Sequence, residues 1–274
     1  MTPYLHSIAA VTKAIETNGS RPVIALAEDL EFYACKYDSP AKLINEYLAH
    51  AFLKIWEIPV LEAAFVHIQQ DHISAEIISN RTQPYHFEKP SFGLKYDDHI
   101  SDVNNVLLGL KGSYTELQKY SNKLDLLKIG LFDLWVANTD RNHNNYNLVL
   151  QSEQQQFRFI PIDHSDIFDG CSLGKRPLAQ LTEEDSVLSS EIAGLYLFPK
   201  SKIITEANLL LQKFPTFVAD CGKLLTPIVA EIPELWCTDR VLLSAQVEEA
   251  VISNHAWLAE TEQNFRMLIE LNFH

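Results

Sequence analysis

The feature that most constrains the fold of this chain is a pair of short apolar runs with the polar turn SEQQQ between them. The first run, Tyr146–Leu150, and the second, Phe157–Ile162, contain the aliphatic and aromatic residues that favour strands. We therefore predict an antiparallel hairpin. Asn145 stands where the first strand would begin and Asp163 stands where the second would end, so the hairpin would bring both side chains to the same edge.

A third polar residue completes this arrangement. Asp140 lies five positions before Asn145, in the polar loop TDRNHNN that follows the apolar segment LFDLWVAN. Phosphoryl transfer asks for little covalent chemistry from the protein and depends mostly on the placement of charge. In such a site Asp140 would orient and deprotonate an acceptor hydroxyl, while Asn145 and Asp163 would hold magnesium through hard oxygen atoms. The spacing is therefore typical of a kinase-type site.

The composition permits a protein of this kind and argues against other classes. With 274 residues, of which 47% are hydrophobic, the chain can bury a large core, either as one domain with two lobes or as two closely joined domains. Its net charge of −14 argues against a broad surface for nucleic acid or anionic membranes, because such binding depends on Lys and Arg.

The cysteines and the apolar runs indicate the cellular compartment in which the protein is expected. The four cysteines, Cys35, Cys171, Cys221 and Cys237, are far apart and lack the spacing of a metal site. No charged-then-apolar leader opens the chain, and no apolar run approaches the roughly 18 residues needed to span a bilayer. These features predict a cytoplasmic protein with free thiols and no membrane partner.

Two lobes are expected, with a division near residue 95. Residues 1–95 combine short strand-like runs with one amphipathic helix, and residues 96–274 are mainly helical apart from the hairpin. This order predicts an α+β, bilobal, protein-kinase-like fold in which a small sheet-rich N-lobe precedes a larger helical C-lobe. The expected strands read PVIALAE, EFYACKY, AAFVHI and AEIIS, and the expected helices are Pro40–Trp56, Leu117–Val136, Ile203–Leu211, Val218–Val229 and Val241–Leu271.

The first lobe contains residues suited to holding a nucleotide. Lys36 ends a strand-like run, where its ammonium group could reach the α and β phosphates, and Glu46 on the following helix could pair with it. Gly19 and Ser20 precede the first of these strands, and a glycine there would let backbone amides approach a phosphate. A plain turn before a strand explains the same two residues equally well.

The segment Ser91–Tyr96, SFGLKY, is the expected hinge between the lobes. Its backbone groups, including those of Phe92, would recognise adenine, and Gly93 would permit close approach. This expectation rests on the position of the segment between the two lobes.

Several neighbours of the polar trio have competing interpretations. Asn144 and Asn147 lie close to Asn145, and we select Asn145 as the metal ligand from its five-residue spacing alone. A histidine and aspartate cluster without further ligands at fixed spacing is a poor zinc signature. Bracing of the loop, or another structural role, is therefore expected of Asn138, Arg141, His143, His164 and Asp166, the last as a cap for the segment that follows it.

These motifs resemble those of the HipA-like kinases, in particular compact relatives that lack the N-terminal subdomain of the full toxin. The shared motifs are GSRP, CKY, NEYLAHAF and, most specifically, NTDRNHNN and PIDHS, and they run from about Gly19 to Asp166. The resemblance implies a bilobal kinase that uses ATP and magnesium to phosphorylate a Ser or Thr hydroxyl of a protein substrate. An antitoxin or other regulatory partner also belongs to that expectation.

Carried onto this sequence, the resemblance assigns a role to each candidate residue. The phosphate-binding lysine would be Lys36, its partner Glu46, the catalytic base Asp140, and the metal ligands Asn145 and Asp163. Ser20 matches the region where members of the family phosphorylate themselves and thereby become silent. The segment after the second acidic residue reads HSD rather than Phe-Gly, so control by an ordinary activation loop is not expected.

Two alternatives from other classes remain open at this level. The same trio would serve a kinase that acts on a small molecule or a lipid head group, because residues that handle phosphate do not identify the acceptor. A nucleotide-binding pseudokinase that works by docking a partner is the other alternative, although every catalytic position is occupied.

Overall fold

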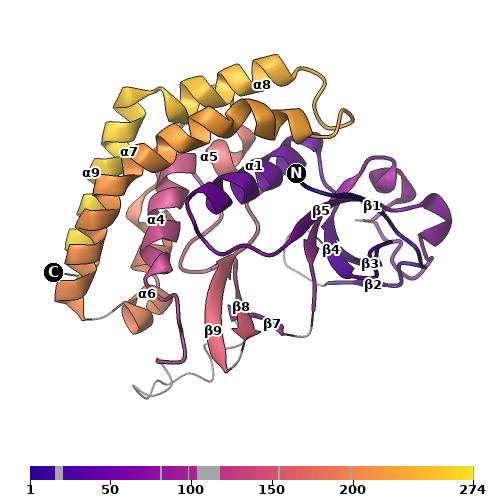
Figure 1. Ribbon diagram of the computed structural model, residues 1–274, viewed down its shortest axis with the longest axis horizontal. Coiled ribbons are helices and arrows are strands. Elements are labelled where there is room, and N and C mark those ends of the chain that lie inside the picture. The colour runs from indigo at the N-terminus through magenta and orange to yellow at the C-terminus, as the bar shows by residue number, and fades with distance from the viewer. Residues whose placement is uncertain are drawn as a thin grey trace.

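The computed structural model has a sheet-rich region beside a larger helical region, as Figure 1 shows. It describes residues 1–15, 21–80, 82–97, 99–103, 118–153, 155–197 and 199–273. The N-terminal strands gather on one side of the molecule, and the long C-terminal helices arch over the other (Figure 1). The expected α+β architecture, with a sheet-rich N-lobe and a helical C-lobe, is confirmed.

The N-lobe is built on one mixed sheet. Its strands are β1 Tyr4–His6, β2 Lys13–Ala14, β3 Val23–Leu26, β4 Phe32–Lys36, β5 Ala63–His67 and β6 Ser91–Lys95, and 3₁₀ helices occur at Gln70–His72 and Pro84–Phe87. Within the described residues the strand order is β1-β5-β6-β4-β3-β2, antiparallel except where β1 runs parallel to β5. Tyr33 and Cys35 of β4 alternate into the core. Lys36, the next residue, therefore points to the other face.

Helix α1 (Pro40–Ile55) lies between the sheet and the large lobe (Figure 1). Pro40 occupies its first turn, where the missing N–H has no partner to lose. The consecutive residues 45–50 are buried, which is the pattern of a helix surrounded by protein rather than one lying on a surface. The helix contacts β6 on one side and α7 (Lys200–Glu231) on another.

Successive residues of α1 bind different parts of the large lobe. Asn45 donates its side-chain amide to the backbone oxygens of Ser165 and Ile167, at 2.8 and 3.0 Å. Two residues on, the Tyr47 hydroxyl donates to the backbone oxygen of Ile228 in α7 at 3.2 Å. These bonds hold the helix against two separate segments of the chain.

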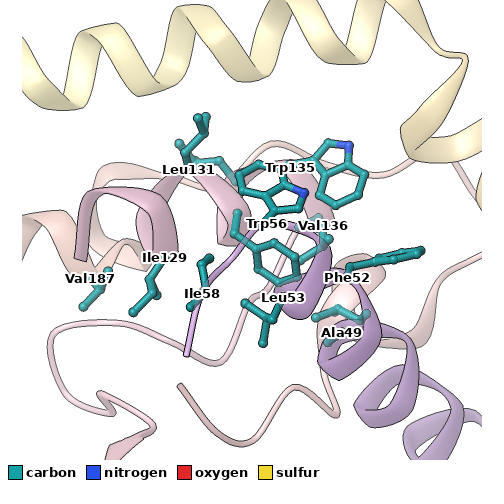
Figure 2. Packing of buried hydrophobic residues seen from close by; sticks show 14 of the residues in the cluster. Ala49, Phe52, Leu53, Trp56, Ile58, Ile129, Leu131, Trp135, Val136 and Val187 are labelled. Atoms are coloured by element: carbon teal, nitrogen blue, oxygen red, sulfur yellow. The ribbon is translucent and has the colours of Figure 1, made fainter. Parts of the chain in front are cut away.

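The end of α1 enters the main hydrophobic core, which Figure 2 shows from close by. Trp56 stacks on Trp135 of α4 (Asp125–Val136), with ring centroids 5.2 Å apart, and on Phe217 of α7, with centroids 5.1 Å apart. Phe52 and Leu53 lie beside them and are also buried (Figure 2). Aromatic side chains bury large apolar areas, so this cluster joins α1 firmly to the helical lobe.

A second sheet carries the hairpin. Its strands are β7 Ile100–Asp102, β8 Leu148–Glu153 and β9 Gln156–Pro161, and within the described residues they pair antiparallel in the order β7-β8-β9. Leu148 is opposite Pro161, and the N–H of Ile162 donates to the backbone oxygen of Asn147 at 2.9 Å. The predicted hairpin is confirmed, although β8 begins at Leu148 instead of Tyr146 and the strands include part of the run expected as a turn. The residues just before β8 and just after β9 meet at one edge.

Helices make up most of the remaining C-lobe. Besides α4 and α7 they are α5 Ile167–Cys171, α6 Glu191–Tyr196, α8 Arg240–Val247 and α9 His255–Phe273, with 3₁₀ helices at Glu183–Asp185 and Val187–Ser189 and a π-helical segment at Glu248–Ile252. Helix α9 packs on α4 and α7. No helix in the described parts of the chain combines the length and the apolar character needed to cross a membrane.

Some expected elements differ from those observed. The strands β3, β4 and β5 and the helix from Pro40 agree with the sequence pattern, but the run AEIIS at 75–79 forms turns instead of a strand. Its buried residue Ile77 packs in the core under the N-lobe sheet, so the run is apolar because it packs there and not because it forms a strand. The helix expected over 117–136 begins only at Asp125 within the described residues.

The bounds of the long C-terminal helices also differ from those that the sequence pattern predicts. Two separate helices were expected where α7 runs unbroken through Pro215 and Pro227. Proline usually ends or kinks a helix, but here one apolar face extends along the whole of α7 and is buried on α1 and α9. The single stretch expected over 241–271 is instead α8, the π-helical segment and α9.

Candidate active site

Lys36, Glu46 and Asp163 meet between the sheet and the hairpin. Lys36 is the last residue of β4, Glu46 lies in the middle of α1, and Asp163 follows β9. The Lys36 Nζ atom is 2.7 Å from Asp163 Oδ1 and also contacts Glu46 Oε1 directly. The Glu46 side chain is only 2% exposed. The structure thus brings together three of the residues that the sequence singled out, from three separate segments.

The charges of this cluster support one another. Burial alone would raise the pKa of Asp163, but Lys36 at its side holds that pKa well below its usual range. Burial would lower the pKa of Lys36, yet the carboxylates of Asp163 and Glu46 raise it above its ordinary value. For Glu46, burial raises the pKa and Lys36 opposes that rise. At neutral pH the cluster therefore presents an ammonium group beside an ionised Asp163.

The backbone at Asp163 is unusual, with a φ of 56°. Aspartate enters this left-handed region more easily than most side chains, and such conformations are concentrated at functional sites. The conformation lies at the point where the chain leaves β9. It therefore helps to turn the carboxylate toward Lys36, which it contacts.

The residues that follow correct one expectation. Asp166 was expected to cap the next segment, but its side chain makes no capping hydrogen bond to α5. Phe168 and Gly170 have left-handed backbone angles, so α5 does not offer the N-terminal amides of a regular helix. Instead the Asp166 carboxylate accepts a 2.7 Å hydrogen bond from Ser165 Oγ, and its Oδ2 lies 3.7 Å from Lys42 Nζ.

A buried carboxylate organises the start of the central loop. Ala137, with a φ of 49°, turns the chain out of α4. Asp133, on the preceding turn, accepts hydrogen bonds from Asn138 Nδ2 at 2.8 Å and from Arg141 Nε at 2.9 Å. Asp133 was not among the residues expected at the site. The signal was a lone acidic residue within the apolar segment LFDLWV, because a buried charge requires a partner.

Arg141 ties the loop to the hairpin and is itself completely buried. Its guanidinium group donates to the backbone oxygens of Tyr146, at 3.0 Å, and Ile162, at 3.2 Å, and contacts that of Asn147. With the bond to Asp133, one side chain thus connects α4, the loop and both ends of the hairpin. The expected bracing role of Arg141 is confirmed.

The histidines near the site differ in their surroundings. Burial and the neighbouring Arg141 lower the pKa of His164 well below its ordinary value. The ring is therefore neutral, and Nε2 accepts a 2.8 Å hydrogen bond from Arg141. His143 is exposed, and its Nδ1 lies 3.2 Å from the backbone oxygen of Glu184. A structural role is thus visible for His164, as the sequence suggested.

Asp140 lies in the loop with asparagines around it. Asn145 Nδ2 donates to the backbone oxygen of Asp140 at 3.1 Å. Asn147 Nδ2 reaches both that oxygen, at 3.3 Å, and the carboxylate Oδ2, at 2.9 Å. Asn144 is exposed and pairs with His143 instead. The three asparagines therefore differ in their contacts, which spacing alone could not show.

The remaining candidates are Gly19, Ser20, Phe92 and Gly93. Gly19 and Ser20 lie outside the described residues. Phe92 and Gly93 lie inside β6 and pair with β4 and β5 on either side, and their expected role in recognising adenine stays a prediction. A Cβ atom at Gly93 would come within 2.8 Å of Val66 Cγ2. This glycine therefore permits close packing of neighbouring strands, and the connection to the C-lobe begins after β6.

A buried histidine lies on α1, one turn beyond Glu46. His50 Nε2 is 2.9 Å from the backbone oxygen of Leu61, and its ring packs edge-on against Phe92, with ring centroids 5.8 Å apart. Burial lowers the pKa of His50 to about 4. The ring is therefore neutral at pH 7, with the Nε2 proton donated to Leu61.

This histidine predicts a loss of stability in mild acid. Because its folded pKa of about 4 lies below the ordinary 6.5, the unfolded chain takes up the proton first as the pH falls. The contribution of His50 is complete above about pH 6.5 and is lost toward pH 4. The preferential protonation of His50 in the unfolded chain should therefore lower the free energy of unfolding by about 2 kcal/mol between pH 7 and pH 5. Urea denaturation of the wild type and of His50→Gln at both pH values measures this change. An equal fall in the free energy of unfolding in both proteins would contradict the prediction.

The side-chain oxygens of Asp163 and Asn145 are of the type that magnesium prefers. Asp163 supplies a carboxylate that Lys36 keeps ionised, and Asn145 has its amide nitrogen engaged by Asp140, which leaves its oxygen as donor. Magnesium is usually held by one or two carboxylates together with water and substrate phosphates. Within the described ranges no larger group of His, Cys, Asp and Glu forms a metal cage. The donor set therefore fits a metal that arrives with a nucleotide.

Comparisons with known proteins agree with this geometry. A family model described as HipA-like kinase matches residues 8–176, more than half of the chain. Similar solved structures include the Helicobacter pylori proinflammatory kinase CtkA, at 13% identity and a TM-score of 0.53, with 97% of this chain and 99% of that chain covered. Another is HipA of Shewanella oneidensis MR-1, in complex with HipB and operator DNA, at 14% identity and a TM-score of 0.45, with 95% and 67% covered.

A search of curated proteins found no match. The likeness to CtkA extends over almost the full length of both chains and shows a shared kinase fold. The family match includes the strand with Lys36, the helix with Glu46, and the loop and hairpin with Asp140 and Asp163. On this match, the chain belongs to the HipA-like kinase family.

Proposed function

We propose that this protein is an ATP- and magnesium-dependent kinase that transfers the γ-phosphoryl group to a Ser or Thr hydroxyl of a protein. The observation that carries the proposal is the contact of Lys36 with both Glu46 and Asp163. Kinases use such a cluster to place nucleotide phosphates next to metal ligands. The family match supports a kinase, and the protein acceptor is the finer part of the proposal.

Lys36 would bind the α and β phosphates of the nucleotide. Its ammonium group is charged and held by Glu46, whose carboxylate is almost completely buried. A buried partner of this kind fixes the direction of a flexible lysine side chain before the nucleotide arrives. Asp163 and Asn145 would hold magnesium, which neutralises negative charge on the phosphates when it is bound.

Asp140 would orient the acceptor hydroxyl and take its proton. Its backbone is fixed by Asn145 and Asn147, and by the 3.3 Å bond from its own N–H to Asn138 Oδ1. The side chain is half-buried, so an incoming hydroxyl can reach it. A positioned base of this type contributes about 10²- to 10⁴-fold to the rate.

The test is transfer of radiolabel from γ-labelled ATP in the presence of magnesium. Asp140→Asn should lower kcat by about 10²- to 10⁴-fold, while ATP binding remains, because asparagine keeps the shape and can still accept the hydrogen bond from Asn147. Asn144→Ala is the matched control in the same loop. Its side chain is exposed and does not touch Asp140, so it should keep wild-type activity.

The location of the label distinguishes the proposal from its alternatives. Label on the protein itself, at Ser20 or elsewhere, or on a protein in a cell extract, would support a protein kinase. Label that appears only on a soluble metabolite or a lipid would point to the small-molecule alternative. No label, together with no thermal shift on addition of ATP, would overturn the proposal in favour of a docking module.

A further inference from the structure

Asn147 lies where the central loop enters β8, and its backbone is fixed from two directions. Its carbonyl oxygen accepts hydrogen bonds from the Ile162 N–H, at 2.9 Å, and from the buried Arg141 side chain. Its φ is 46°, a left-handed value that asparagine tolerates better than most residues. These constraints place the side chain in one direction, toward the loop.

The side chain of Asn147 is directed at Asp140. Its Nδ2 atom is 2.9 Å from Asp140 Oδ2 and 3.3 Å from the Asp140 backbone oxygen. Both of these atoms can only accept from an amide, so the NH₂ group, and not the oxygen, must face them. A hydrogen bond from an amide to an ionised carboxylate is among the stronger ones in proteins.

The contact differs in kind from that of Asn145. Among the described residues, the amide of Asn145 binds the backbone oxygen of Asp140 and not its carboxylate, so it fixes the loop and not the rotation of the Asp140 side chain. Asn147 engages one carboxylate oxygen and thereby fixes the rotation of the side chain. Among the described residues no hydrogen bond engages the other oxygen, Oδ1, so it can face an acceptor hydroxyl.

We propose that Asn147 is a positioning residue that holds the Asp140 carboxylate in the orientation required for phosphoryl transfer. The inference rests on the proposed function, because it assigns Asn147 a task in the same reaction. Spacing from Asp140 did not reveal this task. It follows from the left-handed backbone, the two anchors of the carbonyl oxygen and the amide contact with Oδ2.

Two substitutions separate this role from a merely structural one. Asn147→Gly keeps a residue that adopts positive φ freely and removes only the amide. Asn147→Asp keeps the size and the tolerance of positive φ but sets a carboxylate against a carboxylate. Misplacement of a catalytic group costs up to about 10²-fold, so Asn147→Gly should lower kcat by about 10- to 100-fold, and Asn147→Asp by at least as much.

The readouts are chosen so that loss of folding cannot imitate the result. The KM for ATP, the magnesium-dependent thermal shift with ATP and the melting temperature should all remain close to wild type in Asn147→Gly. Asn144→Gly, which adds the same backbone freedom in the exposed part of the loop, should keep the wild-type kcat. A fall in ATP affinity or melting temperature that accounts for the loss of activity would overturn the inference.

A double-mutant cycle gives the sharpest test. If Asn147 acts through the Asp140 carboxylate, then Asn147→Gly should cause no further loss of kcat in an Asp140→Ala background. Equal losses in both backgrounds would show that Asn147 acts elsewhere and would refute the inference.

A readout without catalysis keeps this inference distinct from the proposed function. A crystal structure of Asn147→Gly should show the Asp140 side chain in a second rotamer, while that of the wild type shows one. If that difference is found but neither protein transfers phosphate, the proposed function fails and the positioning contact remains. If labelling by the wild type succeeds and the rotamer and kcat of the variant are unchanged, the positioning role is refuted alone.

Discussion

Asp163→Ala is expected to abolish magnesium-dependent ATP binding and phosphoryl transfer while leaving the protein folded. The substitution removes the carboxylate that Lys36 keeps ionised at the edge of the hairpin, and with it the main metal ligand that we propose. Lys36 retains Glu46 as its partner, so no unpaired charge is left buried. The loss should exceed the roughly 10²- to 10⁴-fold effect of removing a general base, because both binding and transfer depend on Asp163.

The thermal shift produced by ATP with magnesium, measured beside label transfer, tests this expectation. Asp38→Ala is a suitable control, because Asp38 lines the same small cavity as Lys36 and Asp163 and its loss changes the net charge equally. The control should keep both the shift and the transfer. Unchanged turnover and magnesium dependence in Asp163→Ala would show that the nucleotide site lies elsewhere.

Arg141→Met is expected to cause the largest loss of stability. Methionine roughly fills the space but provides none of the hydrogen bonds. Asp133, which is buried, would keep only Asn138, and the backbone oxygens of Tyr146 and Ile162 would lose their donors. Breaking a buried ion pair by removing one partner typically costs about 3 to 5 kcal/mol.

Urea denaturation at pH 7 measures this difference. Lys223→Met is the control, because Lys223 also pairs with an aspartate, Asp220, at 2.6 Å, and these two side chains are 72% and 41% exposed. Exposed pairs contribute about 0 to 1 kcal/mol, so the control should be nearly neutral. Similar, small losses in both variants would mean that the central loop is held mainly by its backbone and not by Arg141.

The sequence was informative where one local pattern decides the structure. The two apolar runs and the polar turn between them predict β8 and β9, and with them the meeting of the residues just before β8 with those just after β9. The positions of Lys36 at a strand end and of Glu46 within a helix follow from equally local patterns. The family resemblance added the expectation that these segments face one another, and the contacts show that they do.

The sequence was less informative where distant packing decides. Gly93 was expected to permit close approach of adenine, and the sequence did not show that its small size is needed against Val66 of the neighbouring strand. The apolar run at 75–79 fills a core without pairing as a strand. Asp133 and Asn147 were overlooked or left ambiguous, because their partners are fixed only once α4 ends and the chain turns through left-handed residues.

The way α1 is bound has a consequence for how such an enzyme could be controlled. Asn45, Glu46 and Tyr47 are consecutive, yet they reach the segment after β9, the β4 lysine and α7 respectively. A switch that swings this helix outward would have to break all these bonds and also withdraw Trp56 from its aromatic stack. Helix movement of that kind would be costly, and we therefore expect control of this kinase to act without displacing α1.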